Sequence, residues 1–231
     1  MPVRDADLWL DEILSLPVLE MARALLGCEL AHRTPEGETA GLVVEVEAYQ
    51  GPEDQAAHSR NGRRTQRVRA MYGPAGHAYV FSVYGMHHCM NVVAGPEGTP
   101  HAVLLRALQP LRGLALMARR RGQPPEAVQE VAAWEGRFAP ALATVWTGQE
   151  PRPPRAVQAL TSGPARLARA LGVSMDQYGW SLRASPLRLG PPPAPARWEV
   201  ATGPRVGVEY AGAWSQKPWR FWIRGNPFVS R

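Results

Sequence analysis

The sequence predicts one α+β domain that spans residues 1–231. Three observations support this prediction. With 45% hydrophobic and 20% charged residues, the composition is typical of a globular protein that can bury a sizeable core. Segments with helical spacing and segments of period two follow one another along the chain. The strand-like runs near the C-terminus, residues 205–210 and 220–223, need a sheet to join, so the proline-rich stretches 151–154 and 191–195 are interpreted as loops rather than domain linkers.

The first half of the chain contains a helix and then a strand. Apolar positions recur at helical spacing over residues 16–26, and Gly27 follows as a stop signal. Between residues 39 and 49 the period is two, which predicts a half-buried strand that carries Glu45 and Glu47 on one face. Residues 51–54, with the sequence Gly-Pro-Glu-Asp, predict a turn into a short helix.

A hairpin and two further helices are expected downstream. The runs 77–84 and 88–93 are rich in β-branched and aromatic residues, and residues 85–87 form the predicted hairpin tip between them. Residues 102–108 predict a strand and residues 111–121 a helix closed by Gly122. The run Thr-Ser-Gly-Pro at 161–164 is a helix opener, so a helix is predicted over residues 164–171, ended by Gly172.

The charge of the protein points to polyanions as partners. The formal net charge is +6, and nearly all 26 basic residues are arginine, with Lys217 the only lysine. The alternative is that arginine richness reflects overall composition and solubility alone. Arg119–Arg121, at the end of a predicted helix, could likewise contact phosphates or form a solvated helix end that favours the helix dipole. The charge by itself does not decide between these alternatives.

Cysteine usage and hydropathy exclude several classes of protein. Cys28 and Cys89 are the only cysteines and are expected to be free, buried thiols. They show no zinc-type spacing, and His87 and His88 would face opposite sides of a strand, so neither a metal nor another cofactor is expected. The acidic N-terminus and the lack of an apolar run of about 20 residues predict a soluble, cytoplasmic protein.

The pair Glu45 and Glu47 is the first candidate for chemistry. Two residues along a strand separate same-face side chains by roughly 6.5 to 7 Å, so both carboxylates could line one cleft and suit inverting hydrolysis of a glycosidic bond. The alternative is an edge strand whose exposed face simply carries charge. Tyr49 on the same face, and then His58 and a group of arginines, favour a site because carboxylate, aromatic, imidazole and cation would converge there.

The hairpin tip is the second candidate. Tyr79 and Phe81 share a face of their strand, whereas Tyr84 lies near the tip, where an aromatic side chain has little core to fill. In a basic protein such an aromatic can wedge into a base stack. Cross-strand packing beside the turn is the alternative interpretation.

Long runs of the sequence resemble one known family. These runs are VEVEAYQGPEDQAAHSRNGRRTQRVRAMYGPAGHAYVFSVYGMHHCMNVV and HAVLLRALQPLRG, with further matches in LPVLEMARALLGCEL, LTSGPARLARALGV and GPRVGVEYAGAWSQKPWRFWIRGNPFVS. Together they are similar to the alkyladenine (3-methyladenine) DNA glycosylase family over nearly the whole chain. The resemblance implies a curved, mainly antiparallel sheet surrounded by helices, with a protruding hairpin that enters the minor groove.

The resemblance also implies roles for individual residues. Glu47 would be the general base that deprotonates the attacking water, and Arg106 would support the flipped nucleotide near that water. Tyr49 would stack on the extruded base, His58 would contact its edge, Phe81 would be a second stacking aromatic and Asn91 would help to exclude guanine. Phe81 lacks the hydroxyl of the tyrosine that is frequent in the family. Tyr84 would be the wedge, Glu45 structural or electrostatic, and the DNA backbone would be bound by Arg60, Arg63, Arg64, Arg67 and Arg69.

The expected activity is removal of damaged purines from double-stranded DNA as the start of base excision repair. Candidate lesions are 3-methyladenine, other alkylated purines, hypoxanthine and ethenoadenine. No lysine lies near the Glu47 strand, so hydrolysis without strand cleavage is expected, by a monomer without an obligate partner. Two alternatives from other classes are a non-catalytic DNA damage-binding module and an ordinary O-glycoside hydrolase that uses Glu45 and Glu47 together.

Overall fold

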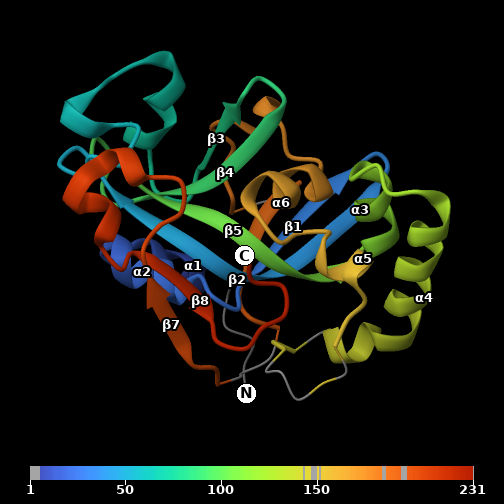
Figure 1. The fold of residues 1–231 in the computed structure, drawn as a ribbon. Coiled ribbons are helices and arrows are strands. Elements are labelled where there is room, and N and C mark those ends of the chain that lie inside the picture. The colour runs from blue at the N-terminus through green and yellow to red at the C-terminus, as the bar shows by residue number, and fades with distance from the viewer. Residues whose placement is uncertain are drawn as a thin grey trace.

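An antiparallel sheet forms the centre of the molecule (Figure 1). The computed structural model describes residues 6–142, 144–146, 150, 152–183, 186–193 and 197–230. Within these residues the sheet has eight strands in the order β3-β4-β5-β2-β1-β6, and β8 pairs with both β2 and β7. The strands are β1 (Glu29–Thr34), β2 (Gly37–Gln50), β3 (Ala78–Val83), β4 (His87–Ala94), β5 (His101–Arg112), β6 (Leu187–Gly190), β7 (Val200–Gly203) and β8 (Arg220–Ile223).

Helices surround this sheet, as the α+β prediction required. The α-helices are α1 (Ala6–Leu14), α2 (Val18–Ala24), α3 (Leu114–Arg120), α4 (Pro125–Leu142), α5 (Arg155–Gln158) and α6 (Pro164–Leu171). Short 3₁₀ helices are η1 (Arg60–Gly62), η2 (Gln66–Tyr72), η3 (Met175–Gln177) and η4 (Glu209–Gln216). Among the described residues, no helix combines the length and the apolar character that crossing a membrane requires. Cys28 and Cys89 are buried free thiols, as predicted.

Strand β2 lies in the interior of the sheet and is buried on both faces. It pairs with β5 along one edge, and with β1 and then β8 along the other. The expectation of a half-buried strand was therefore wrong, and so was the alternative of an edge strand with exposed charge. Glu45 and Glu47 are both fully buried. Buried carboxylates need partners, and two arginines described below supply them.

The β3–β4 hairpin is covered differently on its two faces. On one face, Val80 and Met90 pack with Leu167 and Leu171 of α6 in the main core. On the other face, Tyr79 packs against Val68 and Met71 of η2. The hairpin therefore stands between the arginine-rich segment of residues 60–72 and helix α6, and Figure 1 shows these two elements on opposite sides of it.

The predicted elements are confirmed where local signals were strong. Helix α6 begins at Pro164 and ends at Leu171, and Gly172 ends it with the left-handed φ of 69° that favours glycine. The hairpin tip lies at residues 84–86, between β3 and β4. The turn at 51–54 leads through further turns to η1 rather than directly into a helix. The described parts of the proline-rich stretches, 152–154 and 191–193, contain no helix or strand, and Pro151 and Pro195 lie outside the described residues.

Two boundaries and one strand were predicted wrongly. Strand β5 continues to Arg112, and helix α3 begins only after Gly113, whose φ of 73° separates the two elements. Residues 205–210 alternate like a strand, but Gly207 has a φ of 75° and the segment turns into η4. The other strand near the C-terminus is instead β7, which pairs with β8 and which the sequence pattern did not indicate.

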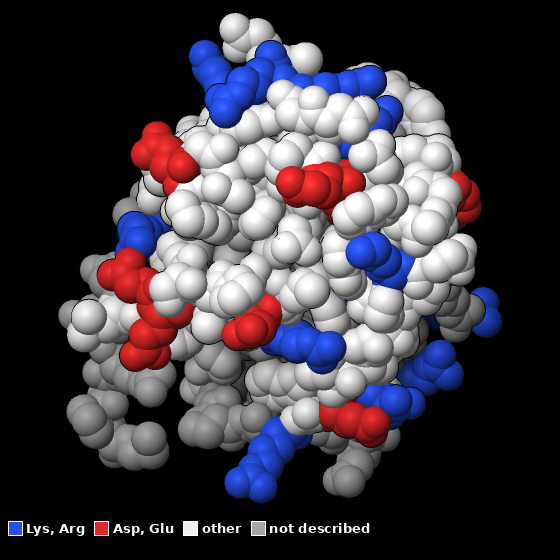
Figure 2. Space-filling model, turned by 90° about the vertical axis from the view of Figure 1, so that its left-hand side faces the viewer, with Lys and Arg blue, Asp and Glu red and all other residues white. Residues whose placement is uncertain are grey.

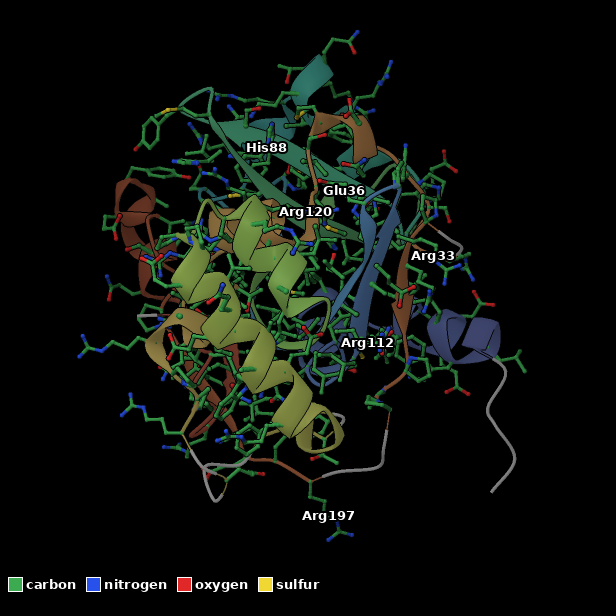
Figure 3. The ribbon with its side chains drawn as sticks, turned by 90° about the vertical axis from the view of Figure 1, so that its right-hand side faces the viewer. Arg33, Glu36, His88, Arg112, Arg120 and Arg197 are labelled. Atoms are coloured by element: carbon green, nitrogen blue, oxygen red, sulfur yellow. The ribbon has the colours of Figure 1, made fainter. Side chains whose placement is uncertain are left out.

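Several arginines serve the fold through ion pairs on the face shown in Figure 3. Arg112 donates two hydrogen bonds to Glu29 and two to Glu38. Arg120 pairs with Glu36 at 2.9 Å, and its side chain is only 9% exposed. Arg120 is therefore neither part of a solvated helix end nor free to contact phosphates, so both interpretations of the Arg119–Arg121 run fail for this residue.

Candidate active site

A pocket of about 270 Å³ opens between the β3–β4 hairpin, the turn after β2 and the loop before η4. Its walls are mainly apolar and aromatic, which suits a planar heterocycle. The lining residues include Tyr49, Ala56, His58, Met71, Tyr79, Phe81, Val83, Cys89, Asn91, Leu104, Arg106, Pro164, Val206, Val208 and Tyr210. The five residues expected to bind the base or to support its nucleotide are all in this set: Tyr49, His58, Phe81, Asn91 and Arg106. Glu47, the expected general base, is not in it.

Glu47 lies directly behind the pocket wall. Its carboxylate is fully buried and is not itself among the lining residues. Oε1 accepts a hydrogen bond from the Val206 backbone N–H at 2.7 Å and lies 3.0 Å from Nη1 of Arg106, while Oε2 accepts one from the Tyr49 hydroxyl at 2.8 Å. All three partners line the pocket. Burial raises the pKa of Glu47, and Arg106, Val206 and Tyr49 oppose that rise.

Glu45 is held in place by a different set of contacts. Oε1 lies 2.7 Å from Nε of Arg106 and 2.7 Å from Nε of Arg220, and it accepts a hydrogen bond from the Ser230 hydroxyl at 2.8 Å. Oε2 accepts one from the Ser230 backbone N–H at 2.6 Å. Arg106 thus bridges the two glutamates, and two arginines balance two carboxylates. Glu45 is not among the pocket-lining residues, so its contacts are those of a structural anchor for Arg106.

Tyr49 has one contact for its hydroxyl and one for its ring. The hydroxyl donates to Glu47, and the guanidinium of Arg205 lies 4.7 Å from the ring centroid. Arg205 is fully buried and paired with Asp54, with Nη2 to Oδ1 at 2.8 Å. Burial and the charge of Glu47 raise the pKa of Tyr49, so its hydroxyl keeps its proton and remains a donor. These two contacts, with Glu47 and with Arg205, hold the Tyr49 ring in the wall of the pocket.

His58, Tyr79 and Phe81 form one aromatic cluster in the pocket wall. Nδ1 of His58 lies 2.7 Å from the Tyr79 hydroxyl, and its ring centroid is 4.5 Å from that of Phe81 in an edge-on arrangement. Burial, together with the charges of Arg67 and Arg60, lowers the pKa of His58 to about 4. The imidazole is therefore neutral at physiological pH. It can present a hydrogen-bonding edge without a charge.

Asn91 lies within β4, and Tyr84 lies at the hairpin tip before that strand. Asn91 is 3% exposed, and its Nδ2 donates to the Tyr79 carbonyl at 3.0 Å, which fixes its orientation in the pocket wall. Tyr84, at the hairpin tip, is 88% exposed and has a φ of 52°, which is uncommon for a non-glycine residue. Cross-strand packing therefore does not explain Tyr84. Met86, beside it, is 73% exposed.

Arginines gather in residues 60–69, which follow the pocket residue His58, although none of them lines the pocket itself. Arg63, Arg64, Arg67 and Arg69 are exposed, and Arg60 is partly exposed. Figure 2 shows basic side chains gathered at the top of this face, where the segment lies in Figure 1. Arg67 is oriented toward the pocket, since its guanidinium lies 5.3 Å from the Phe81 ring centroid.

Sequence reasoning missed the loop that closes the pocket. Val206 donates its backbone N–H to Glu47, and Tyr210 lines the pocket while its hydroxyl donates to the Ala56 carbonyl at 3.0 Å. The loop was interpreted as a strand because Val206, Val208 and Tyr210 alternate with other residues. Gly207 was the available signal, because a glycine inside a strand pattern frequently marks a break.

An aromatic pocket with a carboxylate behind its wall, near an exposed aromatic residue at a hairpin tip and a group of arginines, is typical of enzymes that act on a base rotated out of DNA. Comparison with known proteins specifies the family. The model of the methylpurine-DNA glycosylase family matches residues 12–227. The chain belongs to this family and is a DNA glycosylase, an enzyme of base excision repair that acts on damaged DNA.

Curated relatives agree with this assignment over almost their full length. A protein of Bacillus cereus strain G9842 is 39% identical over 217 residues, which cover 92% of this chain and 94% of the relative. A protein of Bacillus anthracis strain CDC 684 / NRRL 3495 is 38% identical over 217 residues with the same coverage. Both carry the name "Putative 3-methyladenine DNA glycosylase".

Proposed function

We propose that the protein removes 3-methyladenine, other alkylated purines, hypoxanthine and ethenoadenine from duplex DNA by hydrolysing the N-glycosidic bond, with Glu47 as the general base. The observation that carries this proposal is the position of the Glu47 carboxylate, one side chain behind the wall of a base-sized aromatic pocket. The contacts of this carboxylate support the roles proposed for Tyr49 and Arg106.

The water that attacks the sugar binds Oε2 of Glu47 in this proposal. A carboxylate oxygen accepts about two hydrogen bonds. Oε1 already meets Val206 and Arg106, whereas Oε2 meets Tyr49 and retains one acceptor position. A water held there is deprotonated as the bond to the base breaks. The carboxylate charge also stabilises the oxocarbenium character that develops on the sugar.

The balance of charge around Glu47 supports its role as a base. Burial raises the pKa of Glu47, so its carboxylate is a stronger base than that of an exposed glutamate, and the charge of Arg106 favours the ionised form. Arg106 in turn is held by Glu45 at 2.7 Å. We assign Arg106 the task of supporting the flipped nucleotide beside the attacking water, and Glu45 the task of positioning Arg106.

The pocket recognises the base by stacking and by its edge. Tyr49 and Phe81 supply stacking surfaces, which are worth about 1 to 3 kcal/mol per base, and an alkylated cationic purine should stack more favourably. We assign the Tyr79 hydroxyl as the donor to Nδ1 of His58, so that Nε2 of the neutral imidazole carries the N–H that contacts the base edge. Asn91 is assigned the exclusion of guanine through its exocyclic amino group.

Entry of the base requires extrusion from the duplex. Tyr84, projecting from the hairpin, fills the gap in the minor groove that the damaged nucleotide leaves. Extrusion costs a few kcal/mol and least for weakly paired bases, so the cost itself selects damage. Arg60, Arg63, Arg64, Arg67 and Arg69 contact phosphates, which position the duplex without reading its sequence.

Hydrolysis without strand cleavage follows from the position of the lysine. Schiff-base chemistry needs an amine at the sugar, and Lys217 is the only lysine of the sequence. Its Nζ lies 4.0 Å from the Trp214 ring centroid and 4.6 Å from that of Trp219. Neither tryptophan lines the pocket. The amine is therefore engaged elsewhere.

A non-catalytic damage-binding module is the remaining alternative. It would share the wedge and the arginines of residues 60–69, but it has no need for a buried carboxylate whose negative charge repels the phosphodiester. The experiment that separates the two incubates the protein with duplexes that contain one lesion and then treats them with alkali. Strand breaks that appear only after alkali support a monofunctional glycosylase. Strand breaks before alkali, or no breaks with any lesion of the panel, contradict the proposal.

A further inference from the structure

A second hollow adjoins the base pocket on the side of helix α6. Its volume is about 580 Å³, and it lies between α5, the start of α6 and the C-terminal residues 227–230. Arg106 and Pro164 line both this hollow and the base pocket, so the two cavities meet across these residues. Arg155, Ser162 and Arg166 give the second hollow a polar and basic lining, in contrast with the aromatic wall of the first.

Two arginines of this hollow, Arg155 and Arg166, have no acidic partner among the described residues, unlike Arg106, which is paired with Glu45 and Glu47. Arg155 and Arg166 are exposed, and no carboxylate of the described residues pairs with either within 4.0 Å. Other arginines of the chain behave differently. Arg112 and Arg120, labelled in Figure 3, each have a glutamate partner. Two uncompensated guanidinium groups around one cavity favour an anion with oxygen acceptors, such as a phosphate group.

The position of the hollow specifies which phosphate it can meet. A nucleotide with its base in the pocket has a backbone phosphate on each side of it, and both must leave the apolar pocket for polar surroundings. The segment of residues 60–67 approaches the pocket through Arg67, whose guanidinium lies 5.3 Å from the centroid of the Phe81 ring, and the hollow borders the pocket at Pro164. This segment and Pro164 belong to elements on opposite sides of the β3–β4 hairpin (Figure 1).

We propose that the hollow between α5, α6 and residues 227–230 binds a backbone phosphodiester group of the damaged strand through Arg155 and Arg166. This phosphate lies on the side of the flipped nucleotide opposite to the phosphates that Arg63 and Arg64 contact. The inference rests on the proposed function, because it assumes that the flipped nucleotide occupies the base pocket. The ligand class is a singly charged phosphodiester within the DNA.

Substrates with single neutral linkages test this assignment. Methylphosphonate replaces one phosphate at a time on both strands of a duplex with one ethenoadenine, and affinity is measured for the wild type, Arg155→Ala/Arg166→Ala and Arg63→Ala/Arg64→Ala. We expect the wild type to lose affinity for neutral linkages on both sides of the lesion in the damaged strand. The Arg155/Arg166 variant should no longer respond on one side, and the Arg63/Arg64 variant should no longer respond on the other.

Salt dependence gives a second readout with a matched control. Each lost phosphate contact reduces the slope of log affinity against log salt by about 1, so the Arg155/Arg166 variant should have a slope smaller by 1 to 2, on the order of one per arginine. Arg224→Ala is the control, because Arg224 is 61% exposed but paired with Glu199. It removes the same charge per residue from a surface outside both cavities, and its slope should equal that of the wild type.

The inference is overturned if the Arg155/Arg166 variant responds to every linkage as the wild type does, or if it loses its response on the same side as the Arg63/Arg64 variant. An equal change of slope in Arg224→Ala would also overturn it. Failure of the proposed function has a different signature. In that case no lesion is excised by the wild type, whereas the linkage scan still reports where the DNA backbone is bound.

Discussion

The hydroxyl of Tyr49 should set the pH range in which Glu47 acts as a base. It donates one of the hydrogen bonds that Glu47 accepts, at 2.8 Å. Burial raises the pKa of Glu47, and this hydrogen bond, with Arg106 and Val206, lowers it again. In Tyr49→Phe the hydrogen bond is lost while the ring remains. The pKa of Glu47 therefore rises further, and less of the carboxylate is ionised at low pH.

The size of the effect follows from the contact that is removed. A hydrogen bond to a charged group is worth about 1.5 to 3 kcal/mol, and one pH unit corresponds to about 1.36 kcal/mol. The acidic limb of the excision rate should therefore move upward by roughly one to two pH units. Above both pKa values the two proteins should excise at nearly the same rate, because phenylalanine keeps the stacking surface.

The assay is single-turnover excision of a cationic alkylated purine at protein concentrations below saturation, from pH 5 to pH 9. Such a base leaves without protonation, and the rate under these conditions reports ionisation of the free enzyme. His58, whose pKa is lowered to about 4, stays neutral across this range. Tyr210→Phe is the matched control, since its hydroxyl lines the same pocket but donates to Ala56. If Tyr49→Phe and Tyr210→Phe both give the wild-type profile, the reasoning is refuted.

Three further substitutions test other parts of the site. Tyr84→Ala removes an 88% exposed ring, so affinity for lesion duplexes should fall by about 1 to 3 kcal/mol with unchanged thermal stability; equal affinity would exclude the wedge. Phe81→Tyr adds a hydroxyl beside His58 and should change lesion preference modestly, which equal relative rates across a lesion panel would contradict. Arg205→Met leaves the Asp54 carboxylate buried without its cation and should lower the free energy of unfolding in urea by about 3 to 5 kcal/mol, whereas a loss below 1 kcal/mol would show that the pair contributes little.

The sequence allowed prediction of the elements that local patterns determine. Helix α6 has an opening proline and a closing Gly172, and the hairpin has glycine at its tip, so both were located correctly. The pair Glu45 and Glu47 is also visible in the sequence, because period two places both carboxylates on one face of a strand. Its burial was not predictable, because the partners that make it tolerable lie far away in the sequence. Arg106 is 61 residues and Arg220 is 175 residues from Glu45.

The closing loop of the pocket shows the same limit. The alternation of Val206 and Val208 is compatible with a strand or with a loop that packs over a pocket. The choice depends on Gly207, whose left-handed φ of 75° breaks the strand, and on the backbone N–H of Val206, which donates to Glu47 across 159 residues of sequence. A backbone donor leaves no signature in its side chain. Such contacts become visible only in the folded protein.

Glu47→Gln is the most direct test of the role of this carboxylate. The substitution preserves the shape of the side chain, and Arg106 keeps its partner Glu45 at 2.7 Å, so the protein should remain folded and should bind lesion duplexes with wild-type affinity. Loss of a general base should lower single-turnover excision of an alkylated purine by about 10² to 10⁴-fold. A folded Gln variant that excises within a few-fold of the wild-type rate would contradict the assignment of Glu47 as the catalytic base.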